Sequence, residues 1–363
     1  MELFAVVTPG LEAPALEEIR AAGFAGAARA PGGVTFEGGW EDAVRANLCL
    51  RGPTRILARV DSFMAFHLAQ LDKRARRVDW GALIRPGTAV RVETSTSRKS
   101  KIYHAGAATQ RIEGALAAAG YPLSPEAPVQ IKARIEDNRV TLSVDTSGES
   151  LHRRGHKQAM AKAPLRETMA ALLLRACGYD GAEPVLDPMC GSGTIPIEAA
   201  EIAAGFWPGR GRDFAFAHLL PCETVDRPVA PAPVAPGPAR IHASDRDEGA
   251  VRAARENAER AGVADRIAFA CADIRDLAAP DGPVGLVLVN PPYGTRIGNK
   301  GPLFGLHATL GERLLSGFSG WRVGLLTSEP GLAKATGLPF LPPGPPIAHG
   351  GLKVRLYRTD PLP

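Results

Sequence analysis

The 363-residue sequence lacks long apolar runs and paired cysteines. Stretches such as Val284–Val289 fall far short of the ~20 residues that a membrane-spanning helix needs. The N-terminal segment MELFAVVTPG has no basic residues ahead of an apolar run, so we expect no signal peptide. The five cysteines are odd in number and show no C-x-x-C spacing, and the eight histidines form no ligand cluster. These absences predict a cytoplasmic protein with reduced thiols, no membrane span and no bound metal.

What the chain does have is an uneven distribution of basic residues. Hydrophobic residues make up 45% and charged residues 22%, which predicts a packed globular protein. Residues 1–156 hold 21 Lys and Arg against 17 Asp and Glu, whereas the remainder holds 22 against 21. Two basic runs, Lys73–Arg77 (KRARR) and Arg98–Lys101 (RKSK), lie in the first part. A basic N-terminal half suits a polyanionic partner, and the alternative is an Arg-rich surface that only contacts solvent.

The first 150 residues predict two small α+β units. Residues 1–60 alternate strand and helix in a ferredoxin-like order. The elements expected there are strands Leu3–Val7, Val34–Phe36 and Arg55–Val60 and helices Leu11–Ala22 and Glu41–Leu50. Residues 61–150 predict a strand over Ala89–Thr94, a helix over Lys101–Ala119 and a hairpin of Val129–Glu136 and Arg139–Asp145. The dipeptide Asp137-Asn138 would make the hairpin turn.

The remainder predicts an α/β domain with a mainly parallel, doubly wound sheet. Its expected strands are Glu183–Leu186, Arg240–Ser244, Arg266–Cys271, Val284–Val289 and Trp321–Thr327, and its expected helices are Pro164–Cys177, Thr194–Ala204 and Glu248–Ala261. An insertion over residues 205–239 interrupts this alternation. Its last part, 228–239, has five prolines and no charge, so we expect an exposed loop rather than a binding element.

The strongest motif is Val185–Thr194, VLDPMCGSGT. An apolar strand ends in Asp187, and a glycine-rich turn then leads into a helix. Gly191 and Gly193 allow a ligand to approach the backbone, and the helix start offers free N–H groups. The turn lacks the G-K-[ST] of a phosphate loop, and Pro196 stands where a dinucleotide fingerprint needs glycine. An acid before such a turn suits a cationic sulfonium ligand, and the alternative is a purely structural turn.

Three further acids follow expected strands. Asp245 comes directly after Ile241–Ser244, where an acid can accept both hydroxyls of a ribose. We expect Asp247 to cap the next helix instead. Asp273 follows the strand that ends at Cys271, and it could receive an adenine amino group or cap a turn.

The sequence Asn290-Pro291-Pro292-Tyr293 follows a buried strand. The Asn290 side chain and the Pro291 carbonyl can both accept hydrogen bonds from an exocyclic amino group, which would orient its nitrogen towards a methyl donor. Tyr293 offers a face for stacking a flipped base. Methyl transfer from a sulfonium depends on alignment and desolvation, so a strong general base is not required. The alternative is a rigid strand-to-loop turn.

Together these motifs resemble the THUMP-domain class I RNA methyltransferases, and among them the bacterial large-subunit ribosomal RNA guanine-N2 methyltransferases. The resemblance extends over nearly the whole chain. It is carried by FAVVTPGLE, GGVTFEG, RKSKIYHAGA, LHRRGHKQAMAKAPLRETMAALLL, LDPMCGSGTIPIEAA, ASDRDEGAVRAARENAERAG and GLVLVNPPYGTRI. Leu151–Gly155 and Ala163–Thr168 make it specific to this group. The 58 residues between Asp187 and Asp245 are many for a Rossmann-like domain, but a family insertion falls there.

The resemblance implies a ferredoxin-like unit at residues 1–60, a THUMP RNA-binding domain at 61–150 and a Rossmann-like methyltransferase domain at 151–363. The cofactor would be S-adenosyl-L-methionine. Its pocket would be lined by Pro164, Leu165, Asp187, Met189, Cys190, Gly191, Ser192, Gly193, Thr194, Asp245, Arg246, Asp273, Ile274 and Asn290. The catalytic residues would be Asn290, Pro291, Pro292 and Tyr293.

The implied function is methylation of guanine N2 in large-subunit (23S) ribosomal RNA, with RNA bound through the N-terminal units. Three alternatives remain. A tRNA guanine-N2 methyltransferase would share this layout, and a DNA adenine-N6 methyltransferase would share the Asn-Pro-Pro-Tyr chemistry. A non-catalytic RNA-binding protein would not need both motifs intact. The target nucleotide and the oligomeric state do not follow from the residues.

Overall fold

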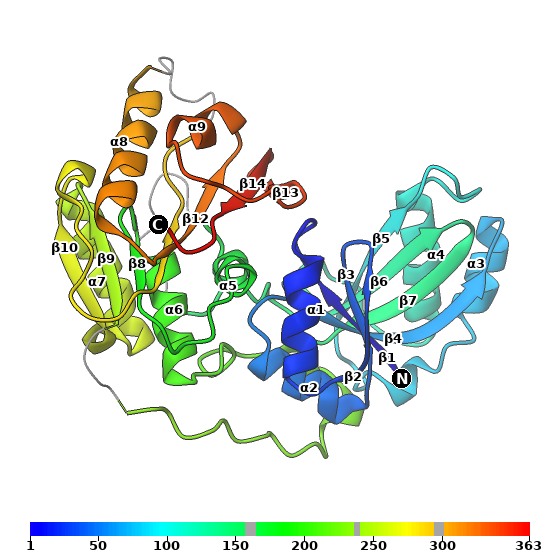
Figure 1. Cartoon of the computed structure of the whole chain (residues 1–363). Coiled ribbons are helices and arrows are strands. Elements are labelled where there is room, and N and C mark those ends of the chain that lie inside the picture. Colours follow the sequence, from blue (N-terminus) through cyan, green and yellow to red (C-terminus); the bar gives the residue numbers. More distant parts are fainter. Residues whose placement is uncertain (157–164, 236–239, 294–300) are drawn as a thin grey trace. The chain divides into compact units, whose positions relative to one another are not determined.

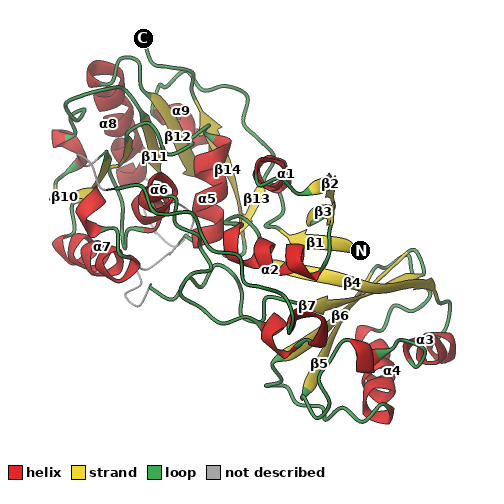
Figure 2. Cartoon of the chain, turned by 90° about the horizontal axis from the view of Figure 1, so that it is seen from below, coloured by secondary structure: helices red, strands yellow, loops and turns green. Residues whose placement is uncertain are grey.

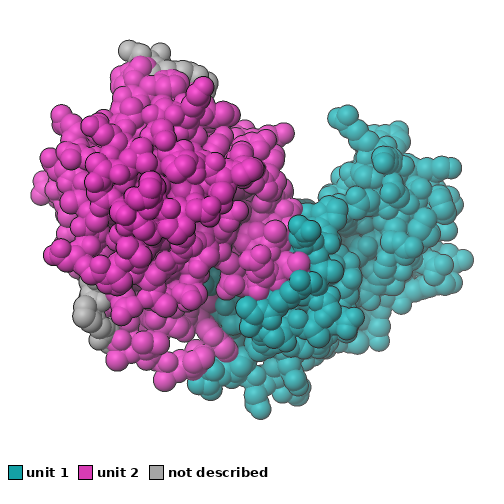
Figure 3. Space-filling model, viewed as in Figure 1, with its two compact units in different colours: residues 1–7, 19–151, 211–229 teal, residues 8–18, 152–210, 230–363 magenta. Residues whose placement is uncertain are grey.

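The computed structural model describes residues 1–156, 165–235, 240–293 and 301–363, which form two compact units (Figure 3). Unit 1 comprises residues 1–7, 19–151 and 211–229, and unit 2 comprises residues 8–18, 152–210 and 230–363. The domain boundaries near residues 60 and 150 therefore stay predictions. No helix in the described ranges is long and apolar enough to cross a membrane.

A single seven-stranded sheet runs through unit 1 in the order β2-β3-β1-β4-β7-β6-β5. Its strands are β1 (Glu2–Val6), β2 (Ala25–Ala30), β3 (Gly33–Glu37), β4 (Arg55–Met64), β5 (Val90–Thr96), β6 (Val129–Glu136) and β7 (Arg139–Asp145). The long strand β4 pairs with β1 on one side and with β7 on the other. The sheet is therefore continuous past residue 60.

Unit 1 confirms the predicted hairpin. Strands β6 and β7 are antiparallel, and the turn residues Asp137 and Asn138 both have positive φ, 47° and 63°. Two left-handed residues give the twist that a two-residue hairpin loop requires. The helices are α2 (Trp40–Cys49), α3 (Leu68–Ala75) and α4 (Ala105–Ala118), with α1 (Glu12–Ala21) divided between the units. Helices α3 and α4 pack together, and α4 also packs on β5 (Figures 1 and 2).

The helix predicted over Lys101–Ala119 begins later than expected, at Ala105. Residues 97–104 form a loop instead. The Ser100 side chain and the Lys101 backbone N–H are tied to the neighbouring hairpin, so the backbone of the loop follows tertiary hydrogen bonds rather than helical ones. Strand β2 and helix α3 were not among the expected elements.

Unit 2 holds the predicted doubly wound sheet, in the order β10-β9-β8-β11-β12-β14-β13. Its strands are β8 (Val185–Asp187), β9 (Ile241–Asp245), β10 (Ile267–Cys271), β11 (Leu286–Val289), β12 (Arg322–Thr327), β13 (Ile347–His349) and β14 (Leu352–Arg358). The first five are parallel, and β14 runs antiparallel to β12. All four residues of β11 are buried, as expected for a central parallel strand. The α/β fold class is confirmed.

Helices cover this sheet on both faces (Figure 1). They are α5 (Glu167–Ala176), α6 (Thr194–Ala204), α7 (Glu248–Ala261), α8 (Gly301–Gly317) and α9 (Pro330–Ala335). Helices α6 and α7 have the predicted bounds, and α5 starts three residues after Pro164, which lies outside the described residues. The expected proline-rich loop is observed up to residue 235, and its Val229 and Val234 side chains are exposed.

Candidate active site

The candidate site lies along the carboxyl edge of the unit 2 sheet. Strand β8 pairs with β9 on one side and with β11 on the other, so the chain order of the strands reverses between β8 and β11. Ligands of open α/β sheets bind at such a switch point, beyond the carboxyl ends of the strands. Here the strands end at Asp187, Asp245 and Val289, directly before the predicted turn and Asn290. The sheet therefore brings the main predicted motifs to one edge.

The glycine-rich turn has the geometry that its sequence predicts. Gly191 and Gly193 have φ of 53° and 86°, which side chains rarely tolerate. A Cβ on Gly193 would stand 3.0 Å from the Ala254 Cβ on α7. Glycine is thus required both by the backbone and by the close approach of α7. The turn delivers Thr194 as the first residue of α6, whose N-terminal N–H groups face the same edge.

Asp187 is almost completely buried, with 2% of its surface exposed. Its Oδ1 accepts a hydrogen bond of 3.1 Å from the Met189 N–H. Burial, together with the nearby charge of Asp245, raises the pKa of the Asp187 carboxyl to about 8. A cation bound next to this carboxyl would stabilise its ionised form.

Asp245 and Asp247 accept hydrogen bonds from different backbone N–H groups, and the ribose-binding role of Asp245 stays a prediction. The Asp245 Oδ2 accepts from the Gly191 N–H at 3.0 Å, and its Oδ1 accepts from the Asp247 N–H at 3.0 Å. Asp245 therefore ties the end of β9 to the glycine turn. Asp247 caps α7 by accepting from the Gly249 N–H at 2.8 Å, so its predicted capping role is confirmed.

Asp273 lies after β10, where it accepts from the Arg275 N–H at 3.0 Å and pairs with the Arg275 guanidinium at 2.8 Å. The ion pair lowers the pKa of the Asp273 carboxyl to about 2. Asp273 caps the short turn Ile274–Asp276, which is the structural alternative that its position allowed. Its role with adenine stays a prediction.

The remaining predicted cofactor residues occupy varied environments. Leu165 and Cys190 are buried, and burial strongly raises the pKa of the Cys190 thiol. Ile274 packs into the hydrophobic core, with Met189 against it, whereas Arg246 is exposed. Pro164 lies outside the described residues. Ser192 is 5% exposed, and its carbonyl accepts the hydrogen bond discussed next.

Two positioning residues were missed by the sequence analysis. Asn257 on α7 is fully buried, and its Nδ2 donates to the Ser192 carbonyl at 3.0 Å. Arg260 donates to the Asn257 Oδ1 at 2.5 Å and to the His156 carbonyl at 2.8 Å. Asn257 stands within the buried stripe of α7, between Ala254 and Ala258. An amide in an otherwise apolar stripe was the signal that could have revealed it, because a buried amide needs partners.

The Asn290–Tyr293 segment leads away from the end of β11. The Asn290 Oδ1 is buried, yet it finds no hydrogen-bond partner among the residues that the structure describes. Pro291 is buried, Pro292 is exposed, and Tyr293 is half-buried. Burial raises the pKa of the Tyr293 hydroxyl to about 12. A buried acceptor without a partner is costly, so this oxygen is poised for a donor from a ligand.

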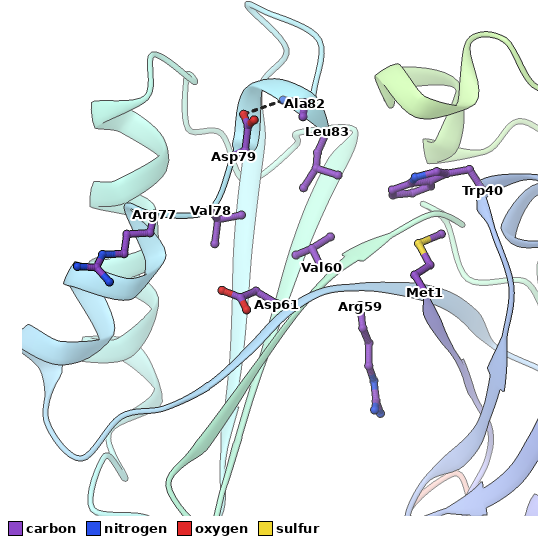
Figure 4. A pocket seen from close by; sticks show the side chains of 10 residues that line it. All are labelled: Met1, Trp40, Arg59, Val60, Asp61, Arg77, Val78, Asp79, Ala82 and Leu83. Atoms are coloured by element: carbon purple, nitrogen blue, oxygen red, sulfur yellow. Dashed lines mark hydrogen bonds between the residues drawn. The ribbon is translucent and has the colours of Figure 1, made fainter.

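A separate pocket of about 450 Å³ lies in unit 1 (Figure 4). Its lining has an apolar part and a charged part. The apolar side chains are Met1, Trp40, Val60, Val78 and Leu83, and the charged ones are Arg59, Asp61, Arg77 and Asp79. The Asp79 carboxylate is engaged in capping, since it accepts from the Ala82 N–H. None of the predicted cofactor or catalytic residues lines this pocket.

Comparison with known proteins agrees with this geometry. Residues 154–338 match the RMKL-like methyltransferase domain, and residues 2–57 match the RlmL ferredoxin-like domain. The ribosomal RNA large subunit methyltransferase K/L of Syntrophotalea carbinolica is 35% identical over 93% of this chain and 50% of its own length. The chain thus spans about half the length of the curated relatives it matches.

Two solved structures share the whole fold. A possible methylase from Clostridium difficile 630 is 27% identical, with a TM-score of 0.88 over 100% of this chain and 98% of that one. SMU.472, described as a methyltransferase complexed with SAH, is 26% identical, with a TM-score of 0.84 over 100% and 98% of the two chains.

The switch-point turn and the aligned strand ends define a Rossmann-like methyltransferase, preceded by a ferredoxin-like module. The chain belongs to the family of RMKL-like methyltransferase domains. The predicted family resemblance is confirmed for the methyltransferase domain and for the ferredoxin-like domain, and the THUMP assignment of residues 61–150 stays a prediction.

Proposed function

We propose that the chain transfers a methyl group from S-adenosyl-L-methionine to the exocyclic N2 of a guanine in large-subunit ribosomal RNA. The observation that carries this proposal is the buried Oδ1 of Asn290, which has no hydrogen-bond partner within the described part of the chain and lies at the edge that also holds the glycine turn. The name of the Syntrophotalea relative supports the choice of RNA.

The residues of the glycine turn fit the cofactor. Gly191 and Gly193 allow the tight turn with positive φ, which places the backbone N–H groups of the turn and of the start of α6 at the sheet edge, and Asp187 would offset the ligand's positive charge. The second oxygen acceptor at this edge, Asp245, is held between Gly191 and Asp247, in reach of a ribose after the strand end. Bound S-adenosyl-L-methionine would supply an electrophilic methyl group. The SAH found in the complex of SMU.472 supports this cofactor.

Asn290 would act on the acceptor nitrogen. Its Oδ1 accepts one N–H of the exocyclic amino group, which orients the nitrogen lone pair away from the amide. Pro291 is buried and holds its backbone carbonyl next to Asn290, where it can accept the other N–H. Tyr293 offers a partly exposed ring for stacking the base. The nitrogen loses its proton to solvent after methyl transfer, so the residues need only to align it.

Nucleoside mass analysis of separated ribosomal RNA and tRNA from cells with and without the gene tests this proposal. We expect N2-methylguanosine to disappear from large-subunit ribosomal RNA only. Its loss from tRNA instead would contradict the substrate and keep the chemistry. A loss of N6-methyladenine from DNA, with both RNAs unchanged, would reject RNA methylation.

A further inference from the structure

A cluster of exposed aromatic and basic side chains gathers at one end of the unit 1 sheet. It consists of Phe66, which follows β4, and of residues of the loop that precedes α4: Arg98, Lys99, Lys101, Tyr103 and His104. We call this cluster the aromatic–basic tip. Tyr103 is 67% exposed and Phe66 is 44% exposed. Large exposed rings among cations are unusual on a surface that only meets water.

The rings and cations of the tip lie close together. The Lys101 Nζ stands 5.9 Å from the centre of the Phe66 ring, and the Tyr103 and His104 rings are 5.0 Å apart. Both segments are joined through Asn138, since its carbonyl accepts from the Ala65 N–H and its Oδ1 accepts from the Lys101 N–H. The hairpin turn between β6 and β7 thereby fixes the tip as one surface.

The loop of the tip is built rather than loose. Ser100 and Ile102 are 4% exposed and alternate with the exposed residues. The Ser100 Oγ accepts from the Asn138 N–H at 3.3 Å, and the Thr96 Oγ1 donates to the Tyr103 carbonyl at 2.9 Å. These anchors hold the backbone while Lys101 and Tyr103 project into solvent. A preorganised surface loses little entropy when it binds a ligand.

The charge of the tip favours a polyanion. The acids beside it are Asp137 and Glu136, and Glu136 is already paired with Arg134 at 3.0 Å. The tip has more cations than this, namely Arg98, Lys99 and Lys101. None of these three forms an ion pair with another described residue. Cations between flat exposed rings can neutralise phosphates while the rings stack on bases.

We propose that the aromatic–basic tip binds a single-stranded segment of RNA, with bases stacked on Phe66 and Tyr103 and phosphates held by Arg98, Lys99 and Lys101. This inference rests on the proposed function, because it assumes that the substrate is RNA. Stacking requires unpaired bases, since the faces of paired bases are covered by their neighbours. The tip therefore prefers single strands over duplex, which a merely basic surface would not do.

Fluorescence anisotropy with the full chain tests the tip. The probes are a labelled single-stranded RNA of mixed sequence and a fully paired hairpin of the same charge, without cofactor. Replacing both rings, Phe66→Ala with Tyr103→Ala, is expected to weaken single-strand binding at least about 30-fold, because each stacked base contributes about 1–3 kcal/mol, and to change hairpin binding little. The variant Tyr103→Phe keeps the ring and is expected to bind like the wild type. Because both side chains are exposed, the fold should be intact, and unchanged SAH affinity by calorimetry verifies this.

The charge variants complete the test. Changing Arg98, Lys99 and Lys101 to Ala should weaken binding and reduce its salt dependence, by about 0.7 in the logarithmic slope for each phosphate that is no longer neutralised. Arg29→Ala, on exposed strand β2, is the matched control and should bind normally. Unchanged single-strand affinity of the ring variant, equal affinity of the wild type for both probes, or no binding at all would overturn the proposal. If the wild type binds SAH and single-stranded RNA but no RNA loses methylation in the deletion strain, the proposed function fails while the tip stands.

Discussion

The carboxyl edge of the unit 2 sheet and the aromatic–basic tip of unit 1 use polar side chains in opposite ways. At the edge, Asp187, Asp245 and Asn257 are tied to the backbone of the glycine turn, and two of the three are buried. At the tip, the backbone is tied and the side chains are exposed. The first arrangement suits one small ligand in one orientation. The second suits a polymer whose charges repeat, because long cationic side chains can follow it.

The largest effect in this comparison is expected from removing the Asn290 Oδ1. This buried acceptor at the carboxyl edge has no hydrogen-bond partner among the described residues. Asn290→Ala should reduce kcat by at least about 100-fold, because the amino group of the base loses its alignment. Cofactor affinity should remain nearly unchanged, since the glycine turn does not depend on the Asn290 side chain. Single-turnover methylation and calorimetry with SAH measure the two quantities. An equal loss of both would refute the role assigned to Asn290.

The next largest effect is expected at the glycine turn. Gly193→Ala places a Cβ 3.0 Å from the Ala254 Cβ at a φ of 86°, so either the turn or α7 must move. We expect cofactor affinity to fall at least about tenfold and the free energy of unfolding to fall by about 1–3 kcal/mol. Calorimetry and urea unfolding would show this.

Gly205→Ala is the matched control for Gly193→Ala. Gly205 also has a positive φ, 71°, but an added Cβ meets nothing within 4 Å. This variant should lose some stability and keep its cofactor affinity. If the two variants lost affinity alike, backbone strain in general would explain the effect, and the close approach of α7 to the turn would not matter.

The parts of this fold that the sequence predicts are those with strong local patterns. Gly193-Thr194 marks the start of α6, and the turn dipeptide Asp137-Asn138 marks the hairpin. Strand β2 was missed because its sequence, AGAARA, lacks the β-branched and aromatic residues that indicate a strand. It forms because β3 offers it an edge to pair with. The predicted start of α4 was wrong because Asn138, distant in sequence, holds Lys101 in a loop.

For the site, the residues at strand ends could be placed from the sequence, but their partners could not. The tie from Asp245 to Gly191 spans 54 residues, and that from Asn257 to Ser192 spans 65. Both depend on how β9 and α7 lie beside the turn. At the aromatic–basic tip, the basic run Arg98–Lys101 is visible in the sequence, but its position beside Phe66 is not, since Phe66 and Lys101 come together only through the hairpin.

Asp187 allows the electrostatics of the edge to be tested by pH. With a pKa of about 8, the carboxyl is protonated at pH 6, so a cationic ligand must displace its proton. Affinity for S-adenosyl-L-methionine should therefore rise by up to about tenfold per pH unit from pH 6 to 8, whereas affinity for SAH, which lacks the sulfonium charge, should change less. Asp187→Asn should flatten the difference, as calorimetry at several pH values would show.

The same carboxyl has a predictable effect on stability. Its folded pKa is raised, so its contribution to stability is present below the unfolded pKa of about 3.9 and is lost as the pH rises through about 8. Asp187→Asn should thus stabilise the ligand-free protein relative to the wild type more at pH 9 than at pH 6. A gain that is equal at both pH values would mean that ionisation of Asp187 is not responsible.

The smallest effect is expected from the other basic run, Lys73–Arg77. It tests whether a basic surface of unit 1 without exposed rings binds RNA differently from the aromatic–basic tip. Arg76 is paired with Asp72 at 2.8 Å, so Lys73, Arg74 and Arg77 are the cations that remain for RNA. Changing these three to Ala should weaken single-stranded and hairpin RNA binding alike, by about several-fold at low salt, and flatten the salt dependence. Because this run offers charge without exposed rings, it cannot distinguish unpaired bases from paired ones. A selective loss of single-strand binding in this variant would place the stacking surface at Lys73–Arg77 and not at Phe66 and Tyr103.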